Sequence, residues 1–169
     1  MSSIEIFGVQ EHDDETFSDL DISQGNLSGH TFENCTFKKC NLNSTNLSKC
    51  KIISCKFVNC DLSNAIFKNS RIRDVEFSGC KLIGIQWYKW VHFDDLVNLS
   101  FQESILQYCN FVGLKLKKTK FFKCDLKEVD FSQSDLTESD FKETELLKAR
   151  FTETNLVKAD FRGATNYLR

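Results

Sequence analysis

The sequence predicts an all-β protein whose chain winds into a four-sided coil stacked on itself. Three patterns lead to this prediction: an apolar residue at every fifth position, a column of small residues two positions earlier, and a regular alternation of Phe and Leu in the C-terminal half. The chain has 169 residues, no proline and only seven glycines. It therefore fits one domain that lacks an ordinary set of loops.

The five-residue period starts at Phe17 and runs to Trp87, then resumes at Leu96 and ends at Phe161. We call the 29 apolar residues on this period the centres, and 28 of them are Phe, Leu or Ile. On an α-helix, five residues advance a side chain by about 500°, which would spread the centres around the axis. On a flat strand, an odd spacing would alternate the centres between faces. All centres point inward only if the chain bends in every unit, which gives coils stacked about 4.8 Å apart.

The number of sides follows from the order of the centres. From Phe101 to Phe161, Phe and Leu alternate through thirteen centres. A three-sided coil would stack Phe on Leu, whereas a four-sided coil of twenty residues stacks like on like, so we expect four sides and about seven coils. Five glycines fall two residues after a centre, where a corner favours a residue without Cβ; they are Gly29, Gly79, Gly84, Gly113 and Gly163.

The column two residues before each centre contains every cysteine of the protein. A zinc site needs ligands that converge on one point, whereas a stacked column gives a line. Because a free thiol behaves as a small buried apolar group, we expect these residues to fill space beside the centres, as in proteins of a reducing compartment. The cysteines are Cys35, Cys40, Cys50, Cys55, Cys60, Cys80, Cys109 and Cys124.

The register of the centres breaks once, because Leu96 follows Trp87 by nine positions, where five or ten would keep the period. Loops on a rigid scaffold often bind partners, and Trp and Tyr are common interface anchors. The alternative is a bulge that packs Trp90 and Phe93 against the core. The candidate partner loop, within the break at 88–95, consists of Tyr88, Lys89, Trp90, His92, Phe93, Asp94 and Asp95.

Residues 1–14 lack the period, and residues 15–169 form the predicted rod. We expect the N-terminal segment to be a cap or a flexible extension. As a cap it would shield the first coil with its apolar side chains, which are Ile4, Ile6, Phe7 and Val9.

Several segments resemble the consensus of the pentapeptide-repeat family, which is a small residue, Asp or Asn, Leu or Phe, and two polar residues. Examples are CysAspLeuSerAsn at 60–64, SerAspLeuThrGlu at 134–138 and AlaAspPheArgGly at 159–163. The resemblance covers about residues 15–166 and implies a right-handed quadrilateral β-helix. Residues 31–42 and 81–85 are most similar to the quinolone-resistance (Qnr-type) and microcin-immunity branch. Members of that branch bind DNA gyrase or topoisomerase IV and protect it from quinolones or peptide toxins, and they are proposed to mimic DNA.

The same resemblance implies a homodimer joined through the C-terminal end. The branch commonly continues into a C-terminal dimer segment, whereas this sequence stops at Arg169. Because uncapped solenoid ends expose core, a second chain would cover the last coil. The predicted dimer end consists of Leu156, Phe161, Tyr167 and Leu168.

Charge is segregated along the chain although the net charge is only −2. Residues 1–37 have eight acidic and no basic residues, residues 38–124 have fifteen basic and six acidic ones, and residues 125–160 have ten acidic and five basic ones. This pattern does not fit a uniformly acidic DNA mimic. A C-terminal dimer would still have an acidic centre, although ordinary solvated corner charge explains the same residues. The candidate acidic face is Asp125, Glu128, Asp130, Asp135, Glu138, Asp140, Glu143 and Glu145.

Other classes of function are not supported. The three histidines form no Ser-His-Asp or Cys-His pattern, no cleft is implied, and no phosphate-binding glycine loop is present, so we expect no enzyme and no cofactor. No segment approaches the roughly 20 apolar residues of a membrane span, and no signal peptide precedes the rod, so we expect a cytoplasmic protein. Direct nucleic-acid binding is not expected, because a cluster of lysines should form a ring and not a stripe; these are Lys115, Lys117, Lys118, Lys120 and Lys123. A generic protein-interaction scaffold remains the alternative to a topoisomerase-binding protein.

Overall fold

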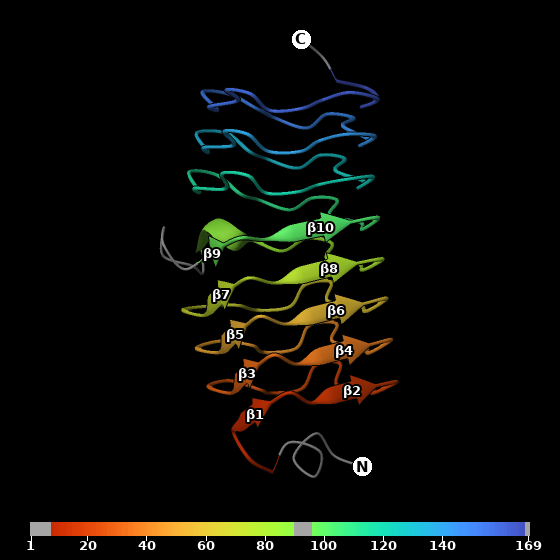
Figure 1. Ribbon diagram of the computed structural model, residues 1–169, viewed down its shortest axis with the longest axis vertical. Helices are drawn as coiled ribbons and strands as arrows, with labels where there is room; N and C mark the ends of the chain where they lie inside the picture. Colours follow the sequence, from red (N-terminus) through yellow and green to blue (C-terminus); the bar gives the residue numbers. More distant parts are fainter. Residues whose placement is uncertain (1–7, 90–95, 168–169) are drawn as a thin grey trace.

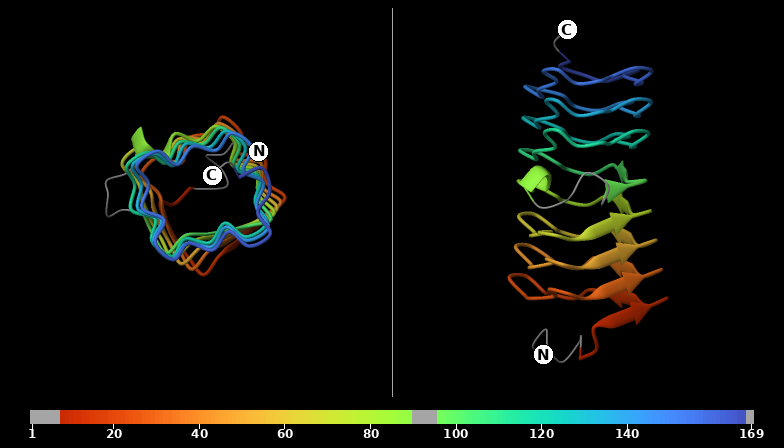
Figure 2. Two further views of the ribbon diagram at one scale, coloured as in Figure 1. Left: turned by 90° about the horizontal axis from the view of Figure 1, so that it is seen from above. Right: turned by 90° about the vertical axis from the view of Figure 1, so that its left-hand side faces the viewer.

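The computed structural model describes residues 8–89 and 96–167, which form one four-sided rod (Figures 1 and 2). Seen along its axis, the chain retraces the same closed outline in successive coils (Figure 2). The four-sided β-helix predicted from the sequence is therefore confirmed. Among the described residues, no helix has the length and apolar character that a membrane crossing requires.

Two parallel sheets run along the rod and form two of its sides. The first side contains β1 (Glu11–Asp13), β3 (Thr31–Glu33), β5 (Lys51–Ile53), β7 (Arg71–Arg73) and β9 (Leu96–Val97) in that spatial order. The second side contains β2 (Thr16–Ser18), β4 (Thr36–Lys38), β6 (Lys56–Val58), β8 (Glu76–Ser78) and β10 (Ser100–Gln102). The third side carries centres such as Leu62 and Leu106, and the fourth carries centres such as Phe67 and Phe111. The 3-10 helix η1 (Trp87–Lys89) ends the described part of the fourth side before the break.

The pairing register gives the length of a coil directly. Phe17 pairs with Phe37 on the second side, and Asp125 bridges Glu145 on the third, both twenty residues apart. Across the break the offset is 24 residues, because Phe77 pairs with Phe101. The break therefore inserts four residues into one coil without changing which centres point inward.

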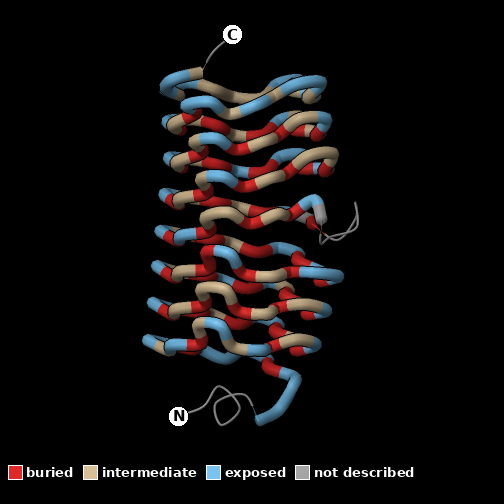
Figure 3. The backbone as a smooth tube through the Cα atoms, turned by 180° about the vertical axis from the view of Figure 1, so that it is seen from behind, coloured by how far each residue is buried: buried red, intermediate tan, exposed pale blue. Residues whose placement is uncertain are grey.

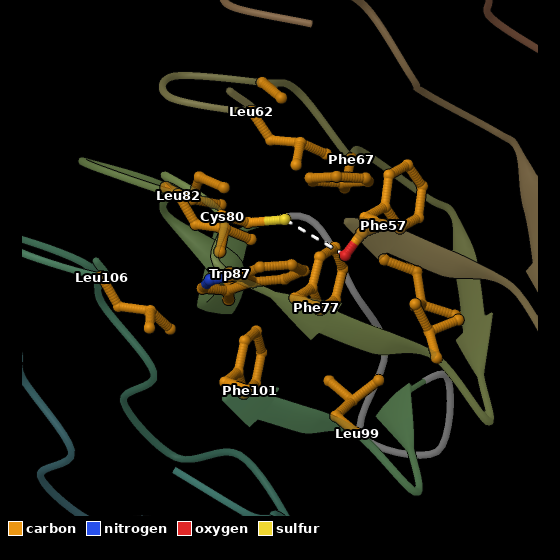
Figure 4. Packing of buried hydrophobic residues seen from close by; sticks show 14 of the residues in the cluster. Phe57, Leu62, Phe67, Phe77, Cys80, Leu82, Trp87, Leu99, Phe101 and Leu106 are labelled. Carbon is orange, nitrogen blue, oxygen red and sulfur yellow. Dashed lines mark hydrogen bonds between the residues drawn. The ribbon is translucent and has the colours of Figure 1, made fainter. Parts of the chain in front are cut away.

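The centres stack like on like, as predicted. The ring centroids of Phe111 and Phe131 lie 5.3 Å apart at 7°, and those of Phe131 and Phe151 lie 5.3 Å apart at 15°. Buried segments recur at the same place in successive coils (Figure 3), and the rings of neighbouring sides meet inside the rod (Figure 4). On the second side every centre is a phenylalanine, namely Phe17, Phe37, Phe57, Phe77, Phe101, Phe121, Phe141 and Phe161.

The corners lie two residues after the centres and have a positive φ, as expected. Glycine occupies some of them, such as Gly113 with φ 72°, but most corners carry other residues, such as Asn59 with φ 54° and Lys123 with φ 55°. On the third and fourth sides this conformation closes a type II turn, in which the amide of Ser134 donates to the carbonyl of Phe131 at 3.1 Å. From Leu106 onward all four sides are built from such turns.

All eight cysteines are buried and lie in the inward column. Their thiols contact backbone carbonyls; the Sγ of Cys80 lies 3.2 Å from the carbonyl oxygen of Phe57 (Figure 4). Burial raises the pKa of Cys109 and Cys124 to about 12, so both are protonated at neutral pH. Within residues 8–89 and 96–167, no group of three or more His, Cys, Asp or Glu residues is arranged to hold a metal ion.

The rod begins earlier than the apolar period indicated. β1 places His12 in the ladder of centres on the first side, where its ring stacks on Phe32 at 5.0 Å and its Nδ1 lies 3.1 Å from Glu15. His30 is buried in the inward column, with its Nδ1 2.9 Å from the carbonyl of Leu27. Val9 is 63% exposed and so does not cap the core. The other proposed cap residues, Ile4, Ile6 and Phe7, lie outside the described residues.

Candidate functional site

The C-terminal end of the rod presents an incompletely covered core. Phe151, Leu156 and Phe161 are centres that remain partly exposed, whereas the centres below them are buried. Tyr167 lies on this end, with its ring 4.7 Å from that of Phe161 and edge-on to Phe151 at 5.8 Å. Three of the four predicted dimer-end residues thus form one apolar platform, and Leu168 lies outside the described residues.

The predicted acidic residues do not lie on one face. Asp125 and Asp130 belong to the third and fourth sides, and Asp135 and Asp140 belong to the first and second, because each precedes the centre of a different side. Glu128, Glu138 and Glu143 occupy corners, and Glu145 stacks on Asp125. The single acidic face is therefore wrong: one coil has four sides, so a run of acidic repeat units encircles the rod. We call the eight residues the acidic belt.

Most of the acidic belt is paired with basic side chains of the same or the next coil. Asp130 lies 3.3 Å from Arg150, Asp140 lies 3.0 Å from Lys142, and Asp125 lies 3.3 Å from Lys127. At the corners, partners twenty residues apart lie 3.7 to 3.9 Å apart. The belt is thus closer to neutral than its acidic count implies. The remaining pairs are Lys117–Asp135, Lys118–Glu138, Lys123–Glu143 and Lys148–Glu128.

The aspartates of the belt also hold the turns. The Oδ1 of Asp130 accepts the amide hydrogen of Ser132 at 2.9 Å, and Asp125, Asp135 and Asp140 make the same contact two residues ahead. Burial alone would raise the pKa of Asp135, but hydrogen bonds from Thr137 and Lys117 outweigh it and hold that pKa below its usual value. These carboxylates therefore have a structural role before any role in recognition.

The candidate partner loop is described only at its first two residues. Trp87 is fully buried and stacks between Phe67 at 5.1 Å and Phe111 at 5.8 Å. Tyr88, which follows it in η1, is 40% exposed, and its amide donates to the carbonyl of Asn110. Lys89 ends η1, while Trp90, His92, Phe93, Asp94 and Asp95 lie outside the described residues, so both interpretations of the loop stay predictions.

The lysines expected to form a ring lie on two adjacent sides. Lys115, Lys117 and Lys118 all flank Leu116 on the first side, because they belong to one repeat unit. Lys120 and Lys123 flank Phe121 on the second side. Three of the five, Lys117, Lys118 and Lys123, pair with carboxylates of the acidic belt.

A further charge pattern was missed from the sequence. Lys38, Lys51, Lys56 and Arg73 form no ion pair with any other described residue, although they lie on strands of the two sheets. Lys51 is even placed directly opposite Arg71 on the neighbouring strand. Aligning residues 38–124 of the sequence at a spacing of twenty residues would have shown that Lys51 and Arg71 lie opposite each other.

Comparisons with known proteins give one matching family and several similar structures. The sequence pattern of the pentapeptide repeat region matches residues 30–93 and 90–161. Among solved structures, a trypsin-treated variant of QnrB1, a plasmid-mediated fluoroquinolone resistance protein, is 22% identical and superposes with a TM-score of 0.51, covering 92% of this chain and 83% of that one. HetL, a pentapeptide repeat protein involved in heterocyst differentiation regulation from the cyanobacterium Nostoc sp. strain PCC 7120, is 13% identical with a TM-score of 0.36, covering 98% and 96%. The QnrB1 likeness supports the fold alone, and comparison with curated protein sequences gave no match.

Proposed function

The chain belongs to the pentapeptide-repeat family, and from this premise we propose that it is a non-enzymatic protein that binds a type II topoisomerase and protects it from a drug or peptide toxin. The choice of partner rests on the sequence resemblance to the Qnr-type branch. The fold is shared with QnrB1, which is named as a fluoroquinolone resistance protein. The proposed working unit is a homodimer joined at the C-terminal ends, in the cytoplasm.

One observation carries the proposal: an apolar platform ends the rod directly beside the acidic belt. Phe161 and Tyr167 stack at 4.7 Å and leave partly exposed apolar surface, which a second chain would bury. Joining two such ends brings two acidic belts together at the middle of a double-length rod. A partner that normally holds DNA has a positively charged groove. Although most carboxylates of the belt are ion-paired, residues 125–160 have ten acidic and five basic residues, so the middle of the dimer keeps a net negative charge of the matching sign.

A supercoiling assay tests the proposal. With purified DNA gyrase and a fluoroquinolone, micromolar protein is expected to preserve supercoiling. Leu156→Asp, which puts a charge on the platform, is expected to lose both protection and dimer formation. The matched control is Val157→Asp, because Val157 is 58% exposed on the same coil and points outward. The proposal would be contradicted if the wild-type protein neither protected the gyrase nor inhibited it.

The second candidate is an interaction scaffold that uses the register break. It is favoured by Tyr88, a 40% exposed aromatic anchored beside the buried Trp87. A pull-down with wild type and Tyr88→Ala distinguishes the two candidate functions. Loss of partners in the variant favours the scaffold, and unchanged partners exclude Tyr88 as the binding contact.

A further inference from the structure

The outward surface of β1, β3, β5 and β7 has its charges sorted along the rod. The acidic residues Glu11, Asp13 and Glu33 lie on β1 and β3, and all three are exposed. The basic residues, Lys51 on β5 and Arg71 and Arg73 on β7, are exposed as well. The flat face thus has three negative charges at one end and three positive charges at the other. We call it the sorted face.

The order of these charges is costly within a single chain. The parallel register places Lys51 opposite Arg71, and like charges in directly opposed positions of neighbouring strands destabilise a sheet. In the C-terminal coils, by contrast, the backbone register places Lys115 opposite Asp135 on the first side and Lys120 opposite Asp140 on the second. Arg73 and Lys51 form no ion pair with other described residues. A face that stacks like charges is better explained by a partner of opposite pattern than by stability of the rod.

We propose that the sorted face binds the same face of a second copy of this chain, with the two rods antiparallel. A two-fold axis that lies in the interface between β3 and β5 places β1 of one chain over β7 of the other. Asp13 then meets Arg73, and Glu11 meets Arg71. The same axis places β3 over β5, which brings Glu33 close to Lys51. A parallel pairing would instead set Arg71 against Arg73 and Glu11 against Asp13, so charge selects the antiparallel one.

The shape of the face agrees with this pairing. A shallow depression of about 260 Å³ lies over β1, β3 and the start of β5, and Glu11, Asp13 and Glu33 line it. An arginine from the second chain brings a planar guanidinium to these carboxylates, which bind it in a forked geometry. The Oδ1 of Asp13 accepts a hydrogen bond from the side-chain amide of Asn34 at 2.9 Å, so this carboxylate is already held in place. The corner acids Asp14 and Asp74 lie beside the flat face and take no part in the pairing.

The size of the face sets the strength of the association. Four strands spaced about 4.8 Å apart span roughly 15 Å of the rod. A face of this length covers much less than the ~800 Å² that each partner buries in a standard interface. The complex should therefore be weak and sensitive to salt. The proposal does not depend on the function proposed above, because it uses the opposite end of the rod.

Sedimentation equilibrium of the full-length protein at about 20 mM NaCl tests the proposal, with the charge reversals Asp13→Arg and Arg73→Asp. Each single variant should associate about tenfold or more weakly than wild type, because like charges then face each other. An equimolar mixture of the two should recover wild-type association. In the mixed dimer the arginine introduced by Asp13→Arg faces the aspartate introduced by Arg73→Asp, and the two native side chains face each other.

Matched controls make the same charge changes away from the sorted face. Asp19→Arg and Lys68→Asp alter exposed positions on other parts of the rod and should leave association unchanged. Circular dichroism of each variant confirms that the rod is folded before its mass is measured.

Three results would overturn the proposal: a wild-type monomer at high protein concentration, single variants that associate like wild type, or a mixture no tighter than its components. Association through the C-terminal platform responds to Leu156→Asp and not to the charge reversals, so the two interfaces fail separately.

Discussion

The N-terminal and C-terminal coils share one interior and differ on the outside, most of all on the first and second sides. In both, phenylalanines of the second side stack at about the same spacing, 4.8 Å for Phe37 and Phe57 and 5.0 Å for Phe121 and Phe141. Outside, the N-terminal coils have two strand sides, and like charges stack on the first of them, whereas the C-terminal coils have four turn sides on which opposite charges pair. The inward residues therefore determine the coil, and the outward residues determine the charge pairing and the strand or turn conformation of its surface.

One outward position, the residue before the centre, differs between many of the turns and the strands. In many turns the residue before the centre is Asp or Asn, and its side chain accepts the amide two residues ahead; Asp61 accepts that of Ser63 at 2.9 Å. On strand sides the same position holds residues such as Thr36 or Lys51. A short carboxylate or amide can satisfy the turn amide, whereas Thr favours extended backbone. The choice between turn and strand therefore depends on a local side chain, while the stacking of the centres is the same in both.

The largest predicted effect concerns the shared interior. Phe57→Ala and Phe121→Ala should each cost about 3–5 kcal/mol, because both rings are buried in the same ladder. Equal losses would show that the two halves have one core, and unequal losses would break the comparison. Phe161→Ala should cost clearly less, since that ring is partly exposed at the end. Chemical denaturation followed by circular dichroism measures all three.

The next effect concerns the turn sides. Asp130→Ala removes the acceptor for the amide of Ser132 and should cost about 1 kcal/mol. Asp130→Asn keeps that acceptor while losing the charge near Arg150, and should cost less than about 0.5 kcal/mol. Thr36→Ala, at the same position of a strand side, should cost only a few tenths of a kcal/mol. If Asn were as harmful as Ala at position 130, the charge and not the turn would matter.

Charge reversal should have opposite signs in the two halves. Lys51→Glu replaces a like-charge pair with Arg71 by an attractive one and should raise the free energy of unfolding by roughly 0.3 kcal/mol. Lys123→Glu destroys the pair with Glu143 at 3.7 Å and should lower it by a similar amount. Thermal melts at low salt, with Lys→Gln at both positions as controls, measure the difference. The same sign at both positions would contradict it.

The smallest effect is a pH dependence in the last coils. Side-chain hydrogen bonds from Arg162, the shortest at 2.6 Å, lower the pKa of Asp160 from 3.8 to about 2. A lowered carboxyl pKa stabilises the fold above the unfolded value, and this stabilisation is lost as pH falls from about 4 to about 2. The effect on stability is small because both groups are exposed. An NMR titration should find the Asp160 midpoint near 2. The midpoint should be higher in Arg162→Gln, which keeps the backbone hydrogen bond of residue 162 but loses those of the guanidinium.

Much of this fold is predictable from the sequence because every centre repeats one requirement, a bulky apolar side chain pointing inward. The alternation from Phe101 to Phe161 even gives the number of sides. His12 escaped the pattern because a polar ring replaces the apolar centre and is held there by Glu15. The acidic belt was misjudged because neighbours on the surface are twenty residues apart, as Lys118 and Glu138 are. The order of charges along the sequence does not show this pairing. It becomes visible when residues twenty positions apart are compared.

The twenty-residue coil itself is tested most directly by engineered disulfides at outward positions. Ser132 and Thr152 lie in one ladder, since the amide of Gln133 donates to the carbonyl of Thr152 and Asp130 bridges Arg150. Their Cα atoms are thus one coil apart, within the range that a disulfide spans. Under mild oxidation Ser132→Cys with Thr152→Cys should form an intramolecular disulfide, and Thr137→Cys with Thr152→Cys, fifteen residues apart, should not. The reverse result would mean a three-sided coil and would contradict the account.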